Sequence, residues 1–348
     1  MIAIAGWDVG GANVKAAWLA FEGGETREVR VSSRPYEIWR DKDRLPQVLR
    51  EVLAEVTAEP PQAMALTMTA ELADVFGTKR EGVLFVLDSL LDAFPGCSGY
   101  ALSLAGQFVP LEVVRVRPLD FAAANWLATA LYACKRHPDC LLVDVGSTTT
   151  DIIPILGGQV AAQGRTDLQR LMTGELIYTG VLRTPLAAIV HSVPVGGRFC
   201  PVSSEYFAIS GDVHLILGHL SPADYSCPTP DGRPPTVTSA RQRLARLVCA
   251  DTEMLNSAEI DEMAHYVYEQ QVRQIGEALL QVLSRLVGRR DLPVVATGIG
   301  SFLTAEVGHR LGLRIVDLET SWGRDASAVA PSVAAAYLLA EQMEAGGP

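Results

Sequence analysis

The sequence predicts an α/β protein built from two related lobes, and a repeated phrase is the main reason. The phrase occurs at residues 8–15 (DVGGANVK) and again at residues 144–151 (DVGSTTTD), each time after a short run of β-prone apolar residues. Strands and then helix-like segments follow each copy, which is typical of an α/β fold with two halves. A chain of 348 residues is long enough to give two lobes an ample core.

Each copy of the phrase is predicted to form a strand, a tight glycine turn and a second strand. Glycine lets the backbone approach a ligand closely, and successive N–H groups in such a turn bind anions. The predicted phosphate-binding residues are Gly10, Gly11, Ala12, Asn13, Lys15, Gly146, Ser147, Thr148 and Thr149. Asp8 and Asp144 stand at the bases of the turns as catalytic carboxylates, and we expect them to hold Mg²⁺ directly or through water. The alternative for each is a hydrogen bond to its own turn.

A third glycine turn occurs late in the chain, at residues 296–301. It follows a buried-type strand and precedes a helix that Ser301 is expected to cap. Neither a Walker-type phosphate loop nor a G-x-G-x-x-G phrase is placed to open a strand-to-helix unit, which disfavours P-loop and Rossmann folds.

The other elements follow from apolar periodicity. The expected strands are residues 2–9, 14–21, 27–34, 63–69 and a pair within 99–114; the expected helices are 44–56, 121–135, 257–287 and 324–344. Short strands are expected over 183–218, and the five prolines of 221–236 indicate a functional lid or mobile loop. The predicted lobes are 1–120, on which a closing helix at 325–344 packs back, and 121–324, with a loop-rich insert at 183–236.

Composition excludes several classes of protein. The formal charge of −11 argues against a nucleic-acid partner, and no apolar stretch approaches the roughly 20 residues needed to cross a membrane. The N-terminus lacks the layout of a signal peptide, and the six cysteines form no C-x-x-C pair, so we expect a cytoplasmic protein with reduced thiols. The sequence leaves the oligomeric state open, and a homo-oligomer is compatible with it.

Taken together, the two hairpins and the late glycine turn resemble the actin, sugar-kinase and Hsp70 superfamily. The resemblance implies a two-lobed actin-like ATPase (ribonuclease H-like) fold with the ligand cleft between the lobes. It also implies that the hairpins hold phosphates and that Gly298 and Gly300 contact the ligand, under the adenosine in nucleotide-binding relatives.

Longer phrases narrow the resemblance to the hydantoinase/oxoprolinase-like group. They are residues 6–13, 67–74, 173–181 and 225–233, and within the group they look like a branch linked to tetrahydromethanopterin-dependent one-carbon metabolism. This implies a transferase of methanofuran biosynthesis that joins the phenol oxygen of γ-glutamyltyramine to an aminomethyl-furan carried as a diphosphate, releasing pyrophosphate. The partners would be a phosphorylated small molecule and a phenolic acceptor. Mg²⁺ would be required, whereas ATP is compatible with the fold but not needed.

The implied chemistry suits the predicted sites. A furanmethyl diphosphate can ionise because the ring oxygen spreads the cation, and turn N–H groups with Mg²⁺ would stabilise the leaving pyrophosphate. A closed cleft would exclude water, which would otherwise capture the cation. Asp151 is the candidate base for the phenol, whose free pKa is about 10, with a strand-end role as the alternative.

Four further ligand-binding residues are predicted from the motif loops, and the glutamates and the arginine among them have a structural alternative. They are Thr69, Glu71, Glu175 and Arg233. Glutamates in such contexts often cap helices, and an arginine on a loop is often only solvated.

Two other functions remain open at this stage. One is an ATP-dependent small-molecule kinase or an oxoprolinase-like amidohydrolase of the same fold. The other is a nucleotide-switched assembly protein without enzymatic activity.

Overall fold

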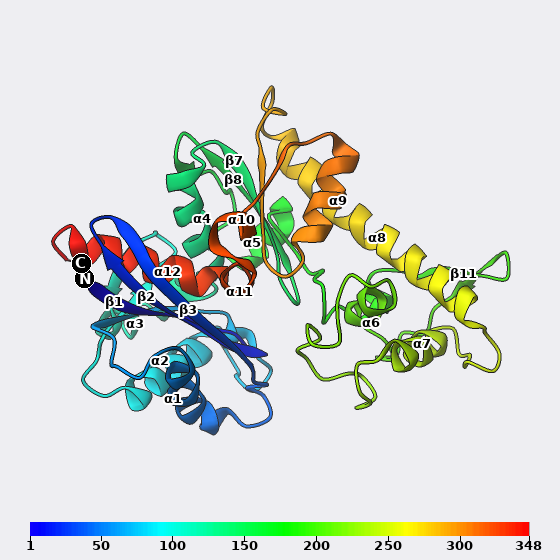
Figure 1. The fold of residues 1–348 in the computed structure, drawn as a ribbon, viewed down its shortest axis with the longest axis horizontal. Coiled ribbons are helices and arrows are strands. Elements are labelled where there is room, and N and C mark those ends of the chain that lie inside the picture. The colour runs from blue at the N-terminus through cyan, green and yellow to red at the C-terminus, as the bar shows by residue number, and fades with distance from the viewer. Residues whose placement is uncertain (348) are drawn as a thin grey trace. The chain divides into compact units, whose positions relative to one another are not determined.

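The structure is a computed structural model that describes residues 1–347, and for residues 319 and 321 the backbone only. The chain forms two compact units (Figure 1). Unit 1 consists of Met1–Leu142, Ile153–Arg170 and the chain from Leu318 onward; unit 2 consists of Val143–Ile152 and Leu171–Asp317. These units differ from the predicted lobes, because the chain beyond residue 120 continues in unit 1 as far as Leu142.

Unit 1 contains a six-stranded sheet in the order β3-β2-β1-β4-β5-β6. Its strands are β1 (Ile2–Val9), β2 (Asn13–Glu22), β3 (Glu25–Pro35), β4 (Ala63–Met68), β5 (Ser98–Leu102) and β6 (Phe108–Pro110). The first three strands form an antiparallel meander, whereas β4 runs parallel to β1 and β5 parallel to β4. This is the ribonuclease H-like arrangement, and it puts the ends of β1 and β4 at the same edge of the sheet.

Helices cover both faces of this sheet. Helices α1 (Leu45–Val56) and α2 (Lys79–Ala93) share one apolar core with β1 and β4. On the other side, α12 (Ala330–Glu344) packs on β1, β2 and β4 and against α4 (Asn125–Arg136). A side chain at Gly6 would overlap the backbone of Ser332, so the glycine lets α12 approach β1. The minor elements of unit 1 are η1 (Lys42–Arg44), η2 (Ala70–Leu72), α3 (Leu111–Val114), η3 (Pro118–Phe121), β9 (Gln159–Val160), α10 (Glu319–Trp322) and α11 (Arg324–Ala328); α5 (Asp167–Thr173) begins here.

The second sheet has the order β10-β8-β7-β13-β14, with β9 paired to β8. Its strands are β7 (Cys140–Val145), β8 (Thr150–Leu156), β10 (Leu176–Ile177), β13 (Val294–Thr297) and β14 (Ile315–Asp317). Unit 2 also contains α8 (Ser257–Ser284), whose Asn256 and Glu259 form a reciprocal N-terminal capping box, and α9 (Ser301–Leu311).

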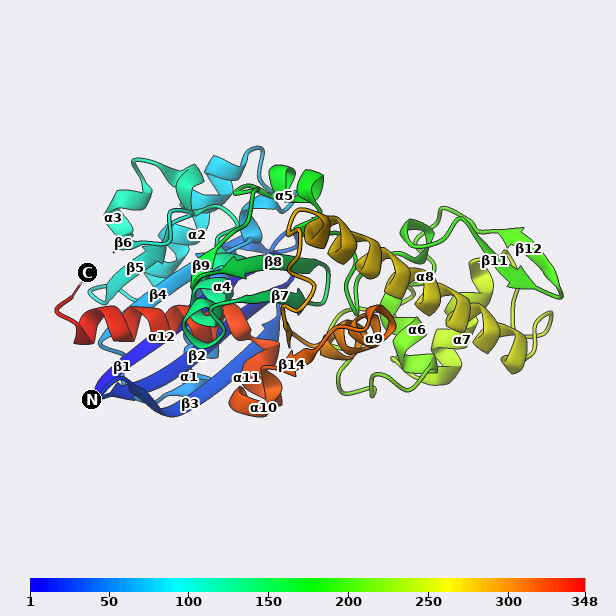
Figure 2. The ribbon, with the colours of Figure 1, turned by 90° about the horizontal axis from the view of Figure 1, so that it is seen from above.

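The elements of the insert between β10 and α8 lie along the N-terminal part of α8 (Figure 2). The insert has an apolar core of its own, which it shares with that part of α8. It contains η4 (Leu186–Ala188), the hairpin β11 (Ser192–Val195) and β12 (Arg198–Pro201), α6 (Ser210–Ile216) and α7 (Val237–Arg246).

Several local predictions were wrong. Residues 210–216 form a helix where strands were expected, because Asp212 accepts a hydrogen bond from the Ile209 N–H (3.1 Å) and starts α6. Ser301 is the first residue of α9 and Gly300 occupies the N-cap. The closing helix is interrupted at Val329, and α12 begins at Ala330 with Pro331 in its first turn. Residues 111–114 are helical and do not continue the predicted strand pair.

In the described part of the chain no helix is both long and apolar enough to span a membrane. Within the described residues, none of the six cysteines forms a disulfide.

Candidate functional site

The first predicted hairpin is present between β1 and β2. Its turn closes with a hydrogen bond from the Gly10 N–H to the Asn13 carbonyl (2.9 Å). The carbonyls of Gly11 and Ala12 accept hydrogen bonds from the N–H groups of Ile38 and Tyr36 (3.0 and 2.9 Å). Within the described residues, the N–H groups of Gly11 and Ala12 donate to no protein acceptor. The turn is therefore held through its carbonyls and offers N–H groups outward, as an anion site requires.

Charged side chains stand at the base of this first hairpin. Asp8 is the second-last residue of β1, is buried, and lies opposite Lys15 in the ladder. The Lys15 ammonium is 3.6 Å from the Asp8 carboxylate. Thr69 follows β4 directly, and its N–H donates to the Val9 carbonyl (3.0 Å), which places residues 69–74 beside the hairpin. The structure thus brings two sequence-distant motifs together in unit 1.

Glu71 lies in this neighbouring segment and is 2% exposed. Neither of its carboxylate oxygens accepts a hydrogen bond from another described side chain, and the nearest cation is the Lys79 ammonium at 3.6 Å. Lys79 itself forms a closer ion pair with Asp167 (2.8 Å). Burial raises the pKa of Glu71 to about 7, with Lys79 opposing the shift. A carboxyl group with this pKa can hold or release a proton near neutral pH.

The second predicted hairpin connects β7 and β8 and repeats the geometry of the first. Its Gly146 N–H donates to the Thr149 carbonyl (2.9 Å), the same spacing as in the first turn. The Gly146 carbonyl accepts from the Val181 N–H, and the Ser147 carbonyl accepts from the N–H groups of Leu182 and Arg183. The N–H groups of Ser147, Thr148 and Thr149 donate to no acceptor in the described chain.

The late glycine turn packs beside this second hairpin in unit 2. Gly298 has φ +86°, and a side chain there would overlap the Asp144 carboxylate. The Gly300 N–H donates to the Val145 carbonyl (2.9 Å), and a side chain there would overlap Val145. Both glycines are thus required by close approach to the end of β7. Asp151 lies on β8, half-buried and paired with Leu176 of β10. Its role as a base stays a prediction.

Glu175 has protein partners for both carboxylate oxygens. It is fully buried, one oxygen pairs with Arg285 (2.7 Å), and the other accepts from the Thr173 hydroxyl (2.9 Å). These contacts link the 173–181 motif to the chain just after α8. A ligand contact of Glu175 stays a prediction.

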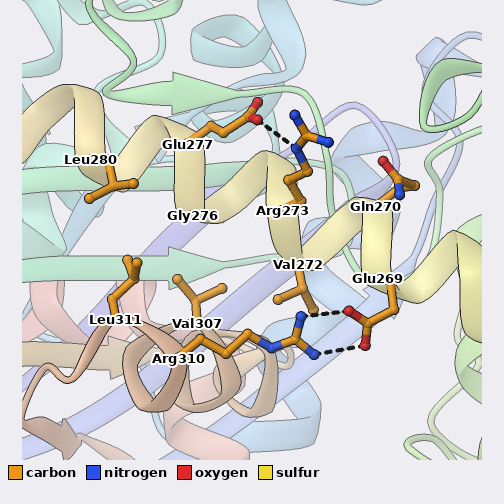
Figure 3. A pocket seen from close by; sticks show the side chains of 10 residues that line it. All are labelled: Glu269, Gln270, Val272, Arg273, Gly276, Glu277, Leu280, Val307, Arg310 and Leu311. Atoms are coloured by element: carbon orange, nitrogen blue, oxygen red, sulfur yellow. Dashed lines mark hydrogen bonds and ion pairs between the residues drawn. The ribbon is translucent and has the colours of Figure 1, made fainter.

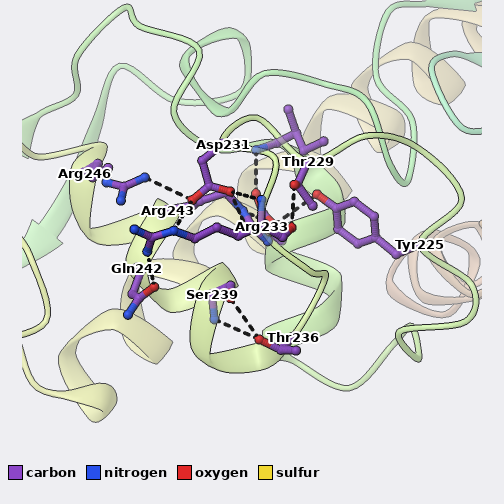
Figure 4. A network of polar contacts seen from close by, with 11 residues as sticks. Tyr225, Thr229, Asp231, Arg233, Thr236, Ser239, Gln242, Arg243 and Arg246 are labelled. Atoms are coloured by element: carbon purple, nitrogen blue, oxygen red, sulfur yellow. Dashed lines mark hydrogen bonds and ion pairs between the residues drawn. The ribbon is translucent and has the colours of Figure 1, made fainter. Parts of the chain in front are cut away.

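The proline-rich loop at 221–236 is fastened to α6 and α7 (Figure 4). Asp231 binds both Arg243 (3.0 Å) and Arg246 (3.2 Å), and the fully buried Arg243 also binds Asp212 (2.6 Å). Arg233 is exposed and donates to Gln242 (2.7 Å). The loop is therefore part of the scaffold of the insert, and the ligand contact of Arg233 stays a prediction.

A surface groove of about 350 Å³ lies between α8 and α9 (Figure 3). Its apolar lining includes Val272, Leu280 and Val307, and the ion pair of Glu269 with Arg310 crosses it (2.6 Å). It contains none of the predicted site residues.

Magnesium is compatible with the carboxylates at the two turns. The described residues contain no group of three acidic, histidine or cysteine side chains arranged to hold a metal by themselves. Mg²⁺ is usually bound by one or two carboxylates together with substrate phosphates and water. Asp8 and Asp144, each beside a turn with outward N–H groups, fit that type of donor set.

Sequence reasoning missed the residues that support the second hairpin from a distance. Gly180 packs on Thr148, and Gln271 of α8 bonds to Gly180 and Thr179. The glycine lies within the 173–181 motif, but nothing in the local sequence marks Gln271.

Proteins of known name have sequences similar to that of this chain. The chain is 37% identical over 344 residues to the (4-{4-[2-(γ-L-glutamylamino)ethyl]phenoxymethyl}furan-2-yl)methanamine synthase of Methanocaldococcus jannaschii, covering 99% of both chains. A synthase of the same name from Methanococcus vannielii is 37% identical over 211 residues, which are 60% of this chain and 93% of that protein.

Among solved structures, the nucleotide-free structure of acetone carboxylase superimposes with a TM-score of 0.57 at 9% identity, covering 96% of this chain and 70% of the other. This likeness concerns the fold alone, and the predicted actin-like, ribonuclease H-like α/β class is confirmed. Residues 62–342 match the sequence model of hydantoinase/oxoprolinase. The chain therefore belongs to the hydantoinase/oxoprolinase family.

Proposed function

We propose that this protein is a synthase that forms an aryl ether between a phenol and a furanmethyl group in methanofuran biosynthesis. The observation that supports this most strongly is the 37% identity, over 99% of both chains, to a synthase whose name describes such a phenoxymethyl-furan product. The donor would be a furanmethyl diphosphate, and the acceptor would be the phenol of γ-glutamyltyramine.

The two hairpins supply what the proposed reaction needs. The bond between the furanmethyl carbon and the diphosphate oxygen breaks, the electron pair leaves with pyrophosphate, and the phenol oxygen bonds to the carbon. The turn N–H groups of Gly11 and Ala12 in unit 1, and those of residues 147–149 in unit 2, are the candidates to stabilise the negative charge that develops on pyrophosphate. Asp8 and Asp144, one at each turn, are the candidates to hold Mg²⁺, which would neutralise further phosphate charge.

The phenol proton must go to a base. Asp151 is the base expected from its place after the second turn. Glu71 is a second candidate, because burial raises its pKa to about 7 beside the first turn. A Glu71→Gln variant that loses turnover while Asp151→Asn retains it would assign the base to Glu71, and the reverse result would assign it to Asp151.

The test of the reaction is mass spectrometry of the purified protein mixed with γ-glutamyltyramine and the aminomethyl-furan diphosphate, with and without ATP. We expect the ether product and pyrophosphate without ATP, and competition of added pyrophosphate with the furan substrate but not with the phenol. An absolute requirement for ATP, with ADP or AMP released in equal amounts, would favour the kinase or amidohydrolase alternative. Nucleotide-dependent polymerisation without turnover would favour the assembly alternative.

A further inference from the structure

A buried chain of hydrogen bonds runs from the support of the second hairpin to the surface of unit 2. The side-chain amide nitrogen of Gln271, on α8, donates to the Gly180 carbonyl (2.9 Å) and to the Thr179 hydroxyl (3.0 Å). The amide oxygen of Gln271 lies 2.9 Å from Nε2 of His214, on α6. Nδ1 of His214 lies 3.2 Å from Nδ1 of His219, which is exposed. Gln271 and His214 are both fully buried.

The proton positions along this chain of hydrogen bonds follow from the Gly180 carbonyl at its inner end. A backbone carbonyl only accepts, so the amide nitrogen of Gln271 faces Gly180 and its oxygen faces His214. His214 therefore carries its proton on Nε2. Burial lowers the pKa of His214 to about 3, which keeps it neutral, and its Nδ1 therefore accepts a hydrogen bond from the Nδ1–H of His219. Each polar side-chain atom of Gln271 and His214 thus acts either as a hydrogen-bond donor or as an acceptor, and the assignment is unique.

The anchored segment is the support on which the second turn rests. Gly180 packs so closely on the turn that a side chain there would lie 2.5 Å from the Thr148 nitrogen. The Thr150 hydroxyl donates to the Thr179 carbonyl (2.7 Å), and the Val181 N–H donates to the Gly146 carbonyl (3.0 Å). A shift of residues 179–181 would therefore move the N–H groups of residues 147–149.

We propose that Gln271, oriented by His214, is a positioning residue that holds the second hairpin in its anion-binding conformation. This inference rests on the proposed function, in which that turn binds the diphosphate. Donors contribute most to binding and catalysis when they are fixed before the charge arrives. Gln271 supplies that rigidity from α8, more than 100 positions along the chain from the turn it supports.

The test compares two substitutions of the same kind on α8. Gln271→Leu removes both donors to residues 179–180. Gln274→Leu is the matched control, because Gln274 lies one turn further along α8 and donates to the Ile189 carbonyl (3.3 Å), away from the hairpin. Each protein is titrated with pyrophosphate in the presence of Mg²⁺ by calorimetry, and its melting temperature and the KM for the phenol are measured.

We expect Gln271→Leu to weaken pyrophosphate binding about tenfold or more, with the KM for the phenol changed less than twofold. Gln274→Leu should bind pyrophosphate as the wild type does. If Gln271→Leu is not obtained folded, Gln271→Glu replaces it, since the carboxylate has the same shape but cannot donate to Gly180, and the same weakening is expected.

Wild-type binding separates failure of the inference from failure of the proposed function. If the wild type does not bind pyrophosphate, the proposed function is wrong and the inference falls with it. If the wild type binds and the Gln271 variant binds equally well, the positioning role alone is overturned, whatever happens to the melting temperature.

Discussion

The two hairpins share a backbone geometry but lie in different chemical surroundings. In both, the first glycine N–H closes the turn onto the carbonyl three residues later at 2.9 Å. Around the first hairpin the side chains are charged, with Lys15 near Asp8 and the buried Glu71 in the adjacent segment. The second hairpin also has acidic neighbours in Asp144 and Asp151, but the segment that supports it from behind is uncharged and consists of glycine contacts and the Thr179–Gln271–His214 hydrogen bonds. The comparison teaches that a repeated phrase specifies the backbone of the turn. Packing against distant residues decides which solution conditions, such as pH, affect the surroundings of each turn.

The largest effect on turnover is expected from substitutions that test whether both turns take part in one reaction. Asp8→Asn and Asp144→Asn should each lower turnover by on the order of 100-fold, because both carboxylates would organise Mg²⁺ at the diphosphate. Steady-state kinetics with an EDTA control measures this, and circular dichroism checks that each variant is folded. Near wild-type turnover of one variant, insensitive to EDTA, would show that its hairpin has no metal role.

Glycine substitutions test how tightly each turn is packed. Gly298→Ala should destabilise the protein by on the order of 3 kcal/mol, because φ is +86° and the added Cβ would overlap Asp144. Gly298 lies in the late glycine turn beside the second hairpin, and Gly11→Ala is the comparison in the first hairpin, where the new Cβ would lie 3.7 Å from Ala73 in ordinary contact. It should cost less than about 1 kcal/mol. Urea unfolding of both variants measures the difference, and equal losses would contradict it.

The free energy of unfolding should depend on pH through Glu71, which lies in the segment beside the first hairpin. The pKa of Glu71 is raised from 4.5 to about 7, so the folded state binds its proton more tightly than the unfolded state does. The resulting stabilisation is complete below pH 4.5 and is lost as the pH rises through 7. It amounts to on the order of 3 kcal/mol.

Glu71→Gln should remove this dependence. Free energies of unfolding measured from pH 4.5 to 8 should fall for the wild type relative to the variant. The free energy of unfolding of Gln271→Leu should have the same pH dependence as that of the wild type, because the hydrogen-bond chain that it interrupts contains the neutral His214. Parallel curves for Glu71→Gln and the wild type would show that Glu71 does not titrate in this window.

The smallest effect concerns the cation of the first hairpin. Lys15→Met keeps the length of the side chain and removes its charge. The KM for the diphosphate substrate should rise about tenfold, which corresponds to about 1.4 kcal/mol of binding, and the KM for the phenol should not change. A larger change in the phenol KM would place Lys15 at the acceptor.

Much of the local structure was predictable because it depends on short-range patterns. The strand 2–9 follows from a run of β-prone apolar residues, the helix ending at Val56 from 3.6-residue periodicity, and the start of α8 at Ser257 from capping. The mistakes lie where a tertiary contact overrides the local pattern, as at α6, whose Asp212 is buried in an ion pair with Arg243 of α7 (2.6 Å). The helix break before Pro331 is an exception, since its proline was visible in the sequence.

The sequence by itself determined the two turns and the aspartates at their bases, because glycine spacing and β-prone flanks act within eight residues. Only the tertiary structure decided that Glu71 is buried without hydrogen-bond donors from other side chains and that Lys79 pairs with Asp167. It also decided that Gln271 and His214 stand behind the second turn. Burial and partners far along the chain set the pKa of a carboxyl group and the rigidity of a loop, and both depend on how distant segments pack. No pattern of neighbouring residues encodes them.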